Sequence, residues 1–128
     1  TFVRNDSVIE PNLRFAGILT AARERDAAYV WAAQVEQAQK NGVRPELIDL
    51  IRAKGDPAAL SQGEREVVNY VRQLMRTNRV EPATFEALKS KHSAQWMVEL
   101  TAIVNFFGFV AGICNAFEVT PPEGGDPI

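Results

Sequence analysis

Apolar residues recur at helical spacing along most of the chain. In five segments they return every three or four positions, and in a sixth they run almost unbroken. A repeat of three to four residues places apolar side chains on one face of a helix, whereas a strand alternates every second residue. The six segments span residues 11–24, 27–41, 45–54, 61–78, 82–91 and 94–117. The sequence therefore predicts an all-α protein with short connections.

Local start and stop residues support these boundaries. A proline opens the first, third and fifth segments, and proline is favoured at the first position of a helix. Gly42 and Gly55 follow the second and third segments, as glycine commonly does at helix C-termini. Ser61 and Glu64 have the spacing of a capping box. The tail, residues 120–128, is rich in proline and glycine, so we expect it on the surface or disordered.

Segment 94–117 is the most apolar part of the chain. Glu99 is its only charged residue, and apolar positions surround the predicted helix instead of following one stripe. Such a helix is normally buried on several sides. Gly108 and Gly112 are four residues apart and predict that a neighbouring backbone packs closely there. We expect segment 94–117 to be the central helix of the domain and also to contribute to a subunit contact. The segment is also long enough to span a membrane, but polar residues within it, such as Asn105, disfavour a membrane span.

The composition limits the classes of protein to which this chain can belong. The chain has 128 residues, of which 46% are hydrophobic, so we expect residues 1–128 to form a single domain with a packed core. Its 14 basic and 16 acidic residues give a net charge of −2, which argues against nucleic acid as a partner. The single cysteine, Cys114, cannot form an internal disulfide, and no signal peptide is visible. These features predict a cytoplasmic protein that has no membrane partner.

Three stretches, in order, resemble a known family. They are ILTAAR with AAYVWAAQVEQAQKNGV, then SQGEREVVNYVRQLMRTNRVEPATFEALK, then VELTAIVNFFGFVAGICNAFEV. Residues 13–120 resemble the carboxymuconolactone decarboxylase family of the alkylhydroperoxidase-like superfamily. The resemblance implies an orthogonal multi-helix alkylhydroperoxidase-like domain, a homo-oligomer, and a small-molecule pocket between helices near the subunit contact. Longer family members carry earlier helices, so a missing or separate N-terminal polypeptide of the same precursor stays open.

The positions that carry chemistry in this superfamily hold unreactive side chains here. Alignment on Tyr-x-Trp places Phe15, Ala27, Val30 and Gln34 where the redox branch has a Glu, two Cys and a His. Disulfide chemistry needs two thiols and a base, so this excludes a thiol peroxidase. The decarboxylase branch lacks the cysteines but generally keeps the His, which is Gln34 here. A glutamine can polarise a carbonyl group by hydrogen bonding but cannot exchange a proton near neutral pH.

The resemblance still predicts a substrate pocket at these positions. Ala27, Trp31 and Gln34 can share one helix face. We expect Gln34 to be catalytic and the pocket to be lined by Phe15, Ala27, Val30, Trp31 and Asn105. The alternatives are a solvated Gln34, a Trp31 that belongs only to a core or interface, and an Asn105 that bonds between helices. The leading hypothesis is a small-molecule lyase of the decarboxylase type, acting on a cyclic or carboxylated organic substrate.

Two further hypotheses stay open. Thr1, if chain cleavage exposed it, would be a nucleophile with its own α-amine as base, because that amine titrates at about 7.7–8.0. The protein would then be an amide or ester hydrolase. The other hypothesis is a non-catalytic oligomeric binding protein.

His92 is expected at a surface or helix end, and Glu99 either complements a helix dipole or supplies a pocket carboxylate. No His or Cys cluster supports a metal, and we expect no cofactor.

Overall fold

The structure, a computed structural model, describes residues 7–128. Within that range no strand occurs. The helical elements are α2 (Pro11–Glu24), α3 (Ala28–Lys40), α4 (Pro45–Arg52), the 3-10 helix η1 (Pro57–Ala59), α5 (Gln62–Thr77), α6 (Pro82–Lys89) and α7 (Ala94–Ala116). The all-α prediction is confirmed, and each predicted α-helix begins and ends within two residues of its expected position.

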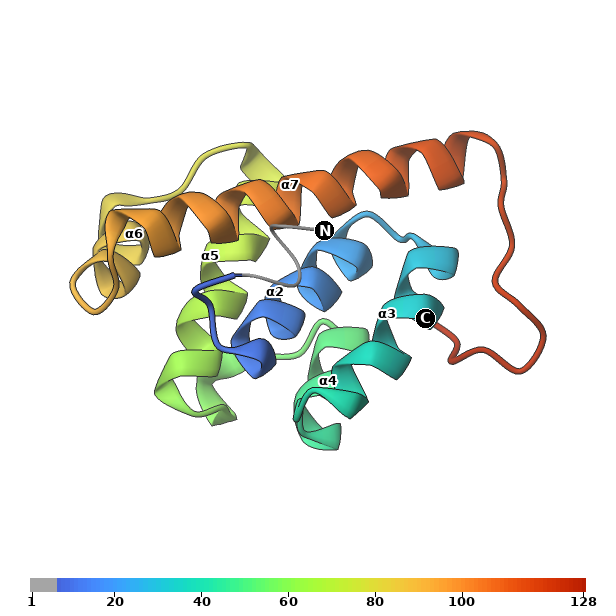
Figure 1. Cartoon of the computed structure of the whole chain (residues 1–128), viewed down its shortest axis with the longest axis horizontal. Coiled ribbons are helices and arrows are strands. Elements are labelled where there is room, and N and C mark those ends of the chain that lie inside the picture. The colour runs from blue at the N-terminus through green and yellow to red at the C-terminus, as the bar shows by residue number, and fades with distance from the viewer. Residues whose placement is uncertain (1–6) are drawn as a thin grey trace.

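Helix α2 lies at the centre of the domain and packs against α3, α4, α5 and α7 (Figure 1). Its residues from Leu13 to Ala22 are all buried. Gly17 brings α2 close to α7, because a side-chain carbon built on it would lie 3.1 Å from Leu100 Cδ1 and 3.3 Å from Val104 Cγ1. We predicted α7 at the centre, and this was wrong. The Ala- and Gly-rich surface of α2 lets neighbours approach from several sides, which the bulky side chains of α7 do not.

Helix α7 crosses one side of the domain, and its exposure differs between its faces (Figure 1). The inner face packs against α2, α3, α5 and α6. The outer aromatic face consists of Phe106, Phe109, Ile113 and Phe117, whose exposed fractions run from 45% for Ile113 to 79% for Phe117. The predicted burial on several sides is therefore wrong within this chain, because no described element covers this face.

The glycines of α7 fit the same picture. A side-chain carbon built on Gly108 would lie 3.7 Å from Met75 Sδ and 3.8 Å from Arg25 Nε, and one built on Gly112 would meet no neighbouring element within 4 Å. The close backbone approach predicted there is not made by any described residue of this chain. By length and composition, α7 is also the one helix in residues 7–128 that could cross a membrane, and 39% of its most apolar window is buried.

Side-chain caps determine where α5 and α7 begin. Ser61 Oγ accepts from Glu64 N at 3.4 Å, and Ser61 N donates to Glu64 Oε1 at 3.2 Å, so the predicted capping box is confirmed. Ser93 Oγ accepts from Trp96 N at 3.1 Å at the start of α7. Glu64 also accepts from Arg44 Nε at 3.0 Å and Nη2 at 2.7 Å. These Arg44 bonds, with those of Ser61, lower the pKa of Glu64.

The C-terminal tail, residues 120–128, turns at the end of α7 and runs back beside α3 (Figure 1). Arg52 Nη2 donates to both carboxylate oxygens of Asp126, at 2.6 and 2.7 Å. Arg52 Nε donates to the Pro127 carbonyl at 3.0 Å. The tail is thus on the surface, as one of the two predicted alternatives had it, and an arginine of α4 anchors it.

Candidate functional site

Four of the five lining residues expected from the resemblance are buried in the hydrophobic core and come from α2 and the start of α3. Phe15 lies on α2, Ala27 directly precedes α3, and Val30 and Trp31 are in the first turn of α3. All four belong to one hydrophobic core, and none is more than 3% exposed. The structure therefore places these four residues in one core as buried apolar side chains.

Gln34 lies one turn further along α3 and is only 8% exposed, so the alternative of a solvated Gln34 is wrong. Its Oε1 atom and the Nε1 atom of Trp31 are buried and have no hydrogen-bond partner among the described residues. Most buried polar atoms in proteins are hydrogen-bonded, and an unsatisfied one costs about 1–3 kcal/mol. An unpaired donor and an unpaired acceptor thus lie three residues apart on α3. We call them the Trp31–Gln34 site.

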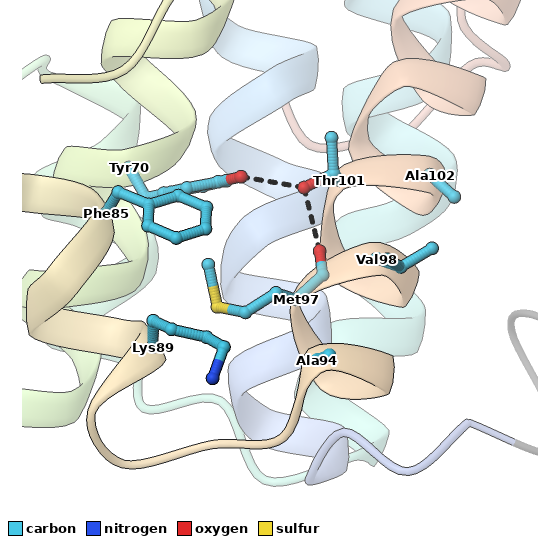
Figure 2. Close-up of a pocket in the computed structure, with 8 residues that line it drawn as sticks. All are labelled: Tyr70, Phe85, Lys89, Ala94, Met97, Val98, Thr101 and Ala102. Carbon is cyan, nitrogen blue, oxygen red and sulfur yellow. Dashed lines mark hydrogen bonds between the residues drawn. The ribbon is translucent and has the colours of Figure 1, made fainter. Parts of the chain in front are cut away.

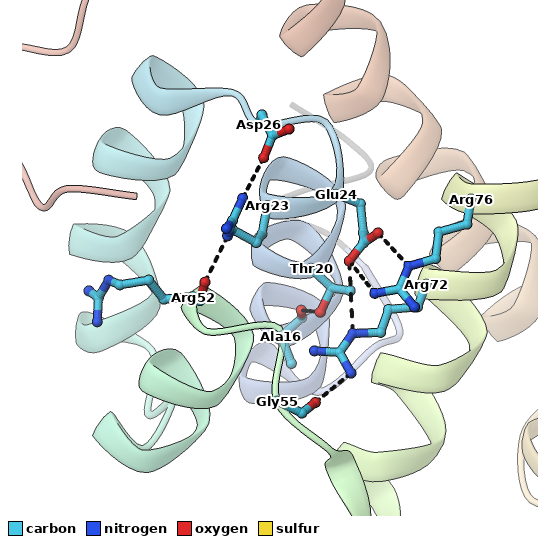
Figure 3. Close-up of polar contacts among 9 residues, drawn as sticks. All are labelled: Ala16, Thr20, Arg23, Glu24, Asp26, Arg52, Gly55, Arg72 and Arg76. Carbon is cyan, nitrogen blue, oxygen red and sulfur yellow. Dashed lines mark hydrogen bonds and ion pairs between the residues drawn. The ribbon is translucent and has the colours of Figure 1, made fainter.

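Arg52 and the C-terminal tail lie over the Trp31 side of α3. The Arg52 guanidinium carbon is 5.6 Å from the centroid of the Trp31 ring. A side-chain carbon built on Gly125 would lie 3.1 Å from Ala32 Cβ, so the tail backbone rests directly on α3. Arg23 Nε donates to the Arg52 carbonyl at 2.7 Å, which ties this cover to α2 (Figure 3). The tail and Arg52 form one covering layer.

The chain's other titratable candidates lie elsewhere. The single histidine, His92, precedes α7 and stacks on Trp96, with ring centroids 3.7 Å apart. Glu99, in α7, is buried; its Oε2 accepts from Val8 N at 3.4 Å, and its Oε1 has no partner in the described range. Glu99 therefore faces the segment before α2. Within residues 7–128 no group of three or more His, Cys, Asp or Glu could hold a metal ion.

Of the two remaining predicted site residues, Asn105 does not join the Trp31–Gln34 site, and Thr1 is not among the described residues. Asn105 is exposed on α7, and its Nδ2 donates to the Thr101 carbonyl of its own helix at 3.0 Å. Within residues 7–128 the Asn105 amide does not enter the site, and no described residue of another helix bonds to it, as our alternative had expected. Thr1 lies outside the described residues, so its role as a nucleophile stays a prediction. The mass of the intact purified chain and of any companion peptide tests it.

A charged cluster that the sequence did not predict joins α2 to α5 (Figure 3). Glu24 accepts from Arg76 Nε at 2.6 Å and Nη2 at 2.9 Å, and Arg72 Nε lies 3.9 Å from Glu24 Oε2. Arg72 Nη1 also donates to the Gly55 carbonyl at 2.7 Å. Burial lowers the pKa of Arg72, and the hydrogen bond to Glu24 raises that of Arg76. The Glu24 side chain is only 5% exposed, because α5 covers it.

A groove of about 550 Å³ lies between α5, α6 and the first half of α7 (Figure 2). Its lining includes Tyr70, Phe85, Met97, Val98, Thr101 and Ala102, with Lys89 as its only charged member. The Tyr70 hydroxyl lies 2.7 Å from Thr101 Oγ1, and Thr101 Oγ1 donates to the Met97 carbonyl at 2.8 Å. Sequence reasoning missed this groove, because its walls come from three helices that meet only in the folded chain.

The chain matches no protein-family model and has no significant match among curated proteins. Its structure is similar to the crystal structure of a protein of unknown function from Agrobacterium tumefaciens that has been proposed to be the antioxidant defence protein AhpD. The two superpose with a TM-score of 0.81 over 94% of this chain and 84% of the other, at 16% sequence identity. The chain therefore has the all-helical AhpD-like fold, and our expectation of an alkylhydroperoxidase-like fold is confirmed. At this identity the likeness establishes the fold alone.

Proposed function

We propose that the Trp31–Gln34 site binds a cyclic or carboxylated organic molecule and promotes its decarboxylation through hydrogen bonds. The observation that carries this proposal is the pair of buried, unpartnered atoms, the donor Nε1 of Trp31 and the acceptor Oε1 of Gln34. A ligand that accepts from the first and donates to the second removes both desolvation penalties on binding. The resemblance of residues 13–120 to the decarboxylase family supports a lyase over a hydrolase.

Loss of CO₂ is a reaction suited to a site without an acid–base residue. The bond between the carboxylate carbon and its neighbour breaks, its electron pair moves onto an adjacent carbonyl oxygen, and CO₂ leaves. The resulting enolate oxygen needs a hydrogen-bond donor, and a preorganised donor stabilises such developing charge. The indole N–H of Trp31 is a donor of this kind. Gln34 orients the substrate by accepting a hydrogen bond, and the enolate carbon takes its proton from water.

The test is CO₂ release from carboxylated lactones and related ring acids. Gln34→Met replaces the side-chain amide by an apolar thioether, and Trp31→Phe removes the indole N–H together with part of the ring. We expect the Trp31 variant to lose about 10²–10³ in kcat, the effect typical of removing one donor to a developing oxyanion. Gln39→Met, at an exposed position of the same helix, is the matched control. Unchanged turnover in both site variants, with folding intact, would contradict the proposal.

A non-catalytic oligomeric binding protein is the second candidate, and the outer aromatic face of α7 favours the oligomer. Monomeric soluble proteins rarely leave a large contiguous apolar patch uncovered. No charge lies between Glu99 and Glu118, so the face offers nothing to select a charged partner. Gly112 leaves room for the backbone of another helix. We propose that a second copy of the chain covers this face, which also favours a cytoplasmic oligomer over a membrane anchor.

A further inference from the structure

We propose that the groove between α5, α6 and α7 binds a free monocarboxylate with an apolar body, and that Lys89 pairs with the carboxylate. This site is separate from the Trp31–Gln34 site, because none of its lining residues comes from α2 or α3. It does not depend on the decarboxylase proposal. The argument combines the shape of the groove, its one charge, and the direction of its internal hydrogen bonds.

The groove has the size and surface of a small-molecule site. Its volume of about 550 Å³ falls within the roughly 300–1,000 Å³ usual for such sites. The side chains of Phe85 on α6 and Met97 on α7 point into the space between the two helices (Figure 2), and Val98 is also part of the lining. Phe85 and Val98 are 38% and 66% exposed, so an apolar ligand would remove them from water. That burial is favourable in proportion to the apolar area covered.

The charge of the groove is positive and uncompensated. Lys89 has no ion-pair partner among the described residues, and it is the only charged side chain in the lining. Lys91, two residues later, contrasts with it, because its ammonium group is held by both carboxylate oxygens of Glu66 at 2.7 and 2.9 Å. A single unpaired ammonium group matches a ligand with one negative charge, and charge-assisted hydrogen bonds are stronger than neutral ones.

The two hydroxyl groups cannot replace Lys89 as donors. Thr101 has one hydroxyl proton, and it goes to the Met97 carbonyl at 2.8 Å. In the 2.7 Å contact with Thr101, Tyr70 must therefore be the donor. Neither hydroxyl proton is available to a ligand, and Tyr70 retains only acceptor capacity. An ionised carboxylate can accept hydrogen bonds but cannot donate them. Among these side chains only Lys89 can donate to it.

Isothermal titration of the purified full chain with octanoate and with octan-1-ol tests the role of the charge. We expect saturable octanoate binding at millimolar concentrations and binding of octan-1-ol that is about three- to tenfold weaker. Lys89→Gln is expected to lower octanoate affinity to the octan-1-ol level and to leave octan-1-ol unchanged. Lys40→Gln, at an exposed lysine of α3, is the matched control. Absence of octanoate binding, or equal affinities for the acid and the alcohol, would overturn the proposal.

A second pair of variants tests the location. Ala102→Trp fills the groove from α7 and is expected to abolish binding of both probes, whereas Asn105→Trp adds the same bulk outside the lining and is expected to change neither. Gln34→Met is also expected to leave octanoate binding unchanged, so failure here is distinct from failure at the Trp31–Gln34 site. If Ala102→Trp instead splits an oligomer and octanoate does not bind, a second copy of the chain occupies the groove and the proposal is wrong.

Discussion

Replacing Gln34 by methionine is expected to stabilise the free protein. Gln34 is 8% exposed, and its Oε1 is buried without a partner in the described chain. Removing an unsatisfied buried acceptor recovers about 1–3 kcal/mol of desolvation cost. Methionine keeps the unbranched shape, and its flexible thioether adapts to irregular space. A small packing mismatch offsets part of this gain, so we expect a net stabilisation of about 1–2 kcal/mol.

Urea denaturation at neutral pH measures this effect. A stabilised variant has a higher midpoint at an unchanged slope, since the slope follows the surface exposed on unfolding. Gln39→Met, on the exposed side of the same helix, should stay within about 0.5 kcal/mol of the parent. The same Gln34 variant is expected to lose turnover, so stability and function should change in opposite directions.

One result would refute this reasoning. If Gln34→Met is no more stable than Gln39→Met, then Oε1 of Gln34 is satisfied in solution, by an ordered water for example. The atom would then carry no unmet hydrogen-bonding capacity, and the proposed function would lose the observation that carries it. A destabilised Gln34→Met with full turnover would be equally damaging.

Three further predictions concern charge, the tail and assembly. Folding lowers the pKa of Glu64, so its contribution to stability is present above the unfolded pKa of about 4.3 and is lost as pH falls through the lower folded value. Glu64→Gln should therefore reduce the fall of the urea midpoint at acid pH. Parallel curves of midpoint against pH for the variant and the parent would contradict this. Asp126→Ala should release the tail and raise acrylamide quenching of Trp31 in a single-tryptophan background, whereas Asp49→Ala should not. Phe109→Glu should reduce the mass measured by light scattering to that of a monomer; an unchanged mass would argue against assembly through the outer aromatic face.

Helix positions followed from the sequence because their causes are local. Pro11, Pro45 and Pro82 each stand at the first position of a helix in the structure, as predicted. The capping bonds of Ser61 and Ser93 likewise join residues three apart. Such interactions are decided by a few neighbouring residues, so they can be recognised without the fold.

The candidate site was only partly foreseeable. The pattern located Trp31 and Gln34 on one helix and showed that their neighbours lack reactive groups. It did not show that Gln34 is buried, because an amphipathic helix with polar residues on several sides does not reveal which of them a neighbour covers. The groove that contains Lys89 and the packing of Arg52 over Trp31 both depend on residues that are distant along the chain. No local sequence pattern indicates that these residues come together.

The amino-acid sequence by itself determined the helices, their caps and the absence of a thiol pair, since each depends on residue type and short-range spacing. The tertiary structure alone decided that α2 is central, that α7 keeps an uncovered aromatic face, and that the side chain of Glu24 on α2 is covered by α5. These outcomes depend on which helix surfaces fit closely together. Close packing is a property of pairs of surfaces, and a single segment does not encode its partner.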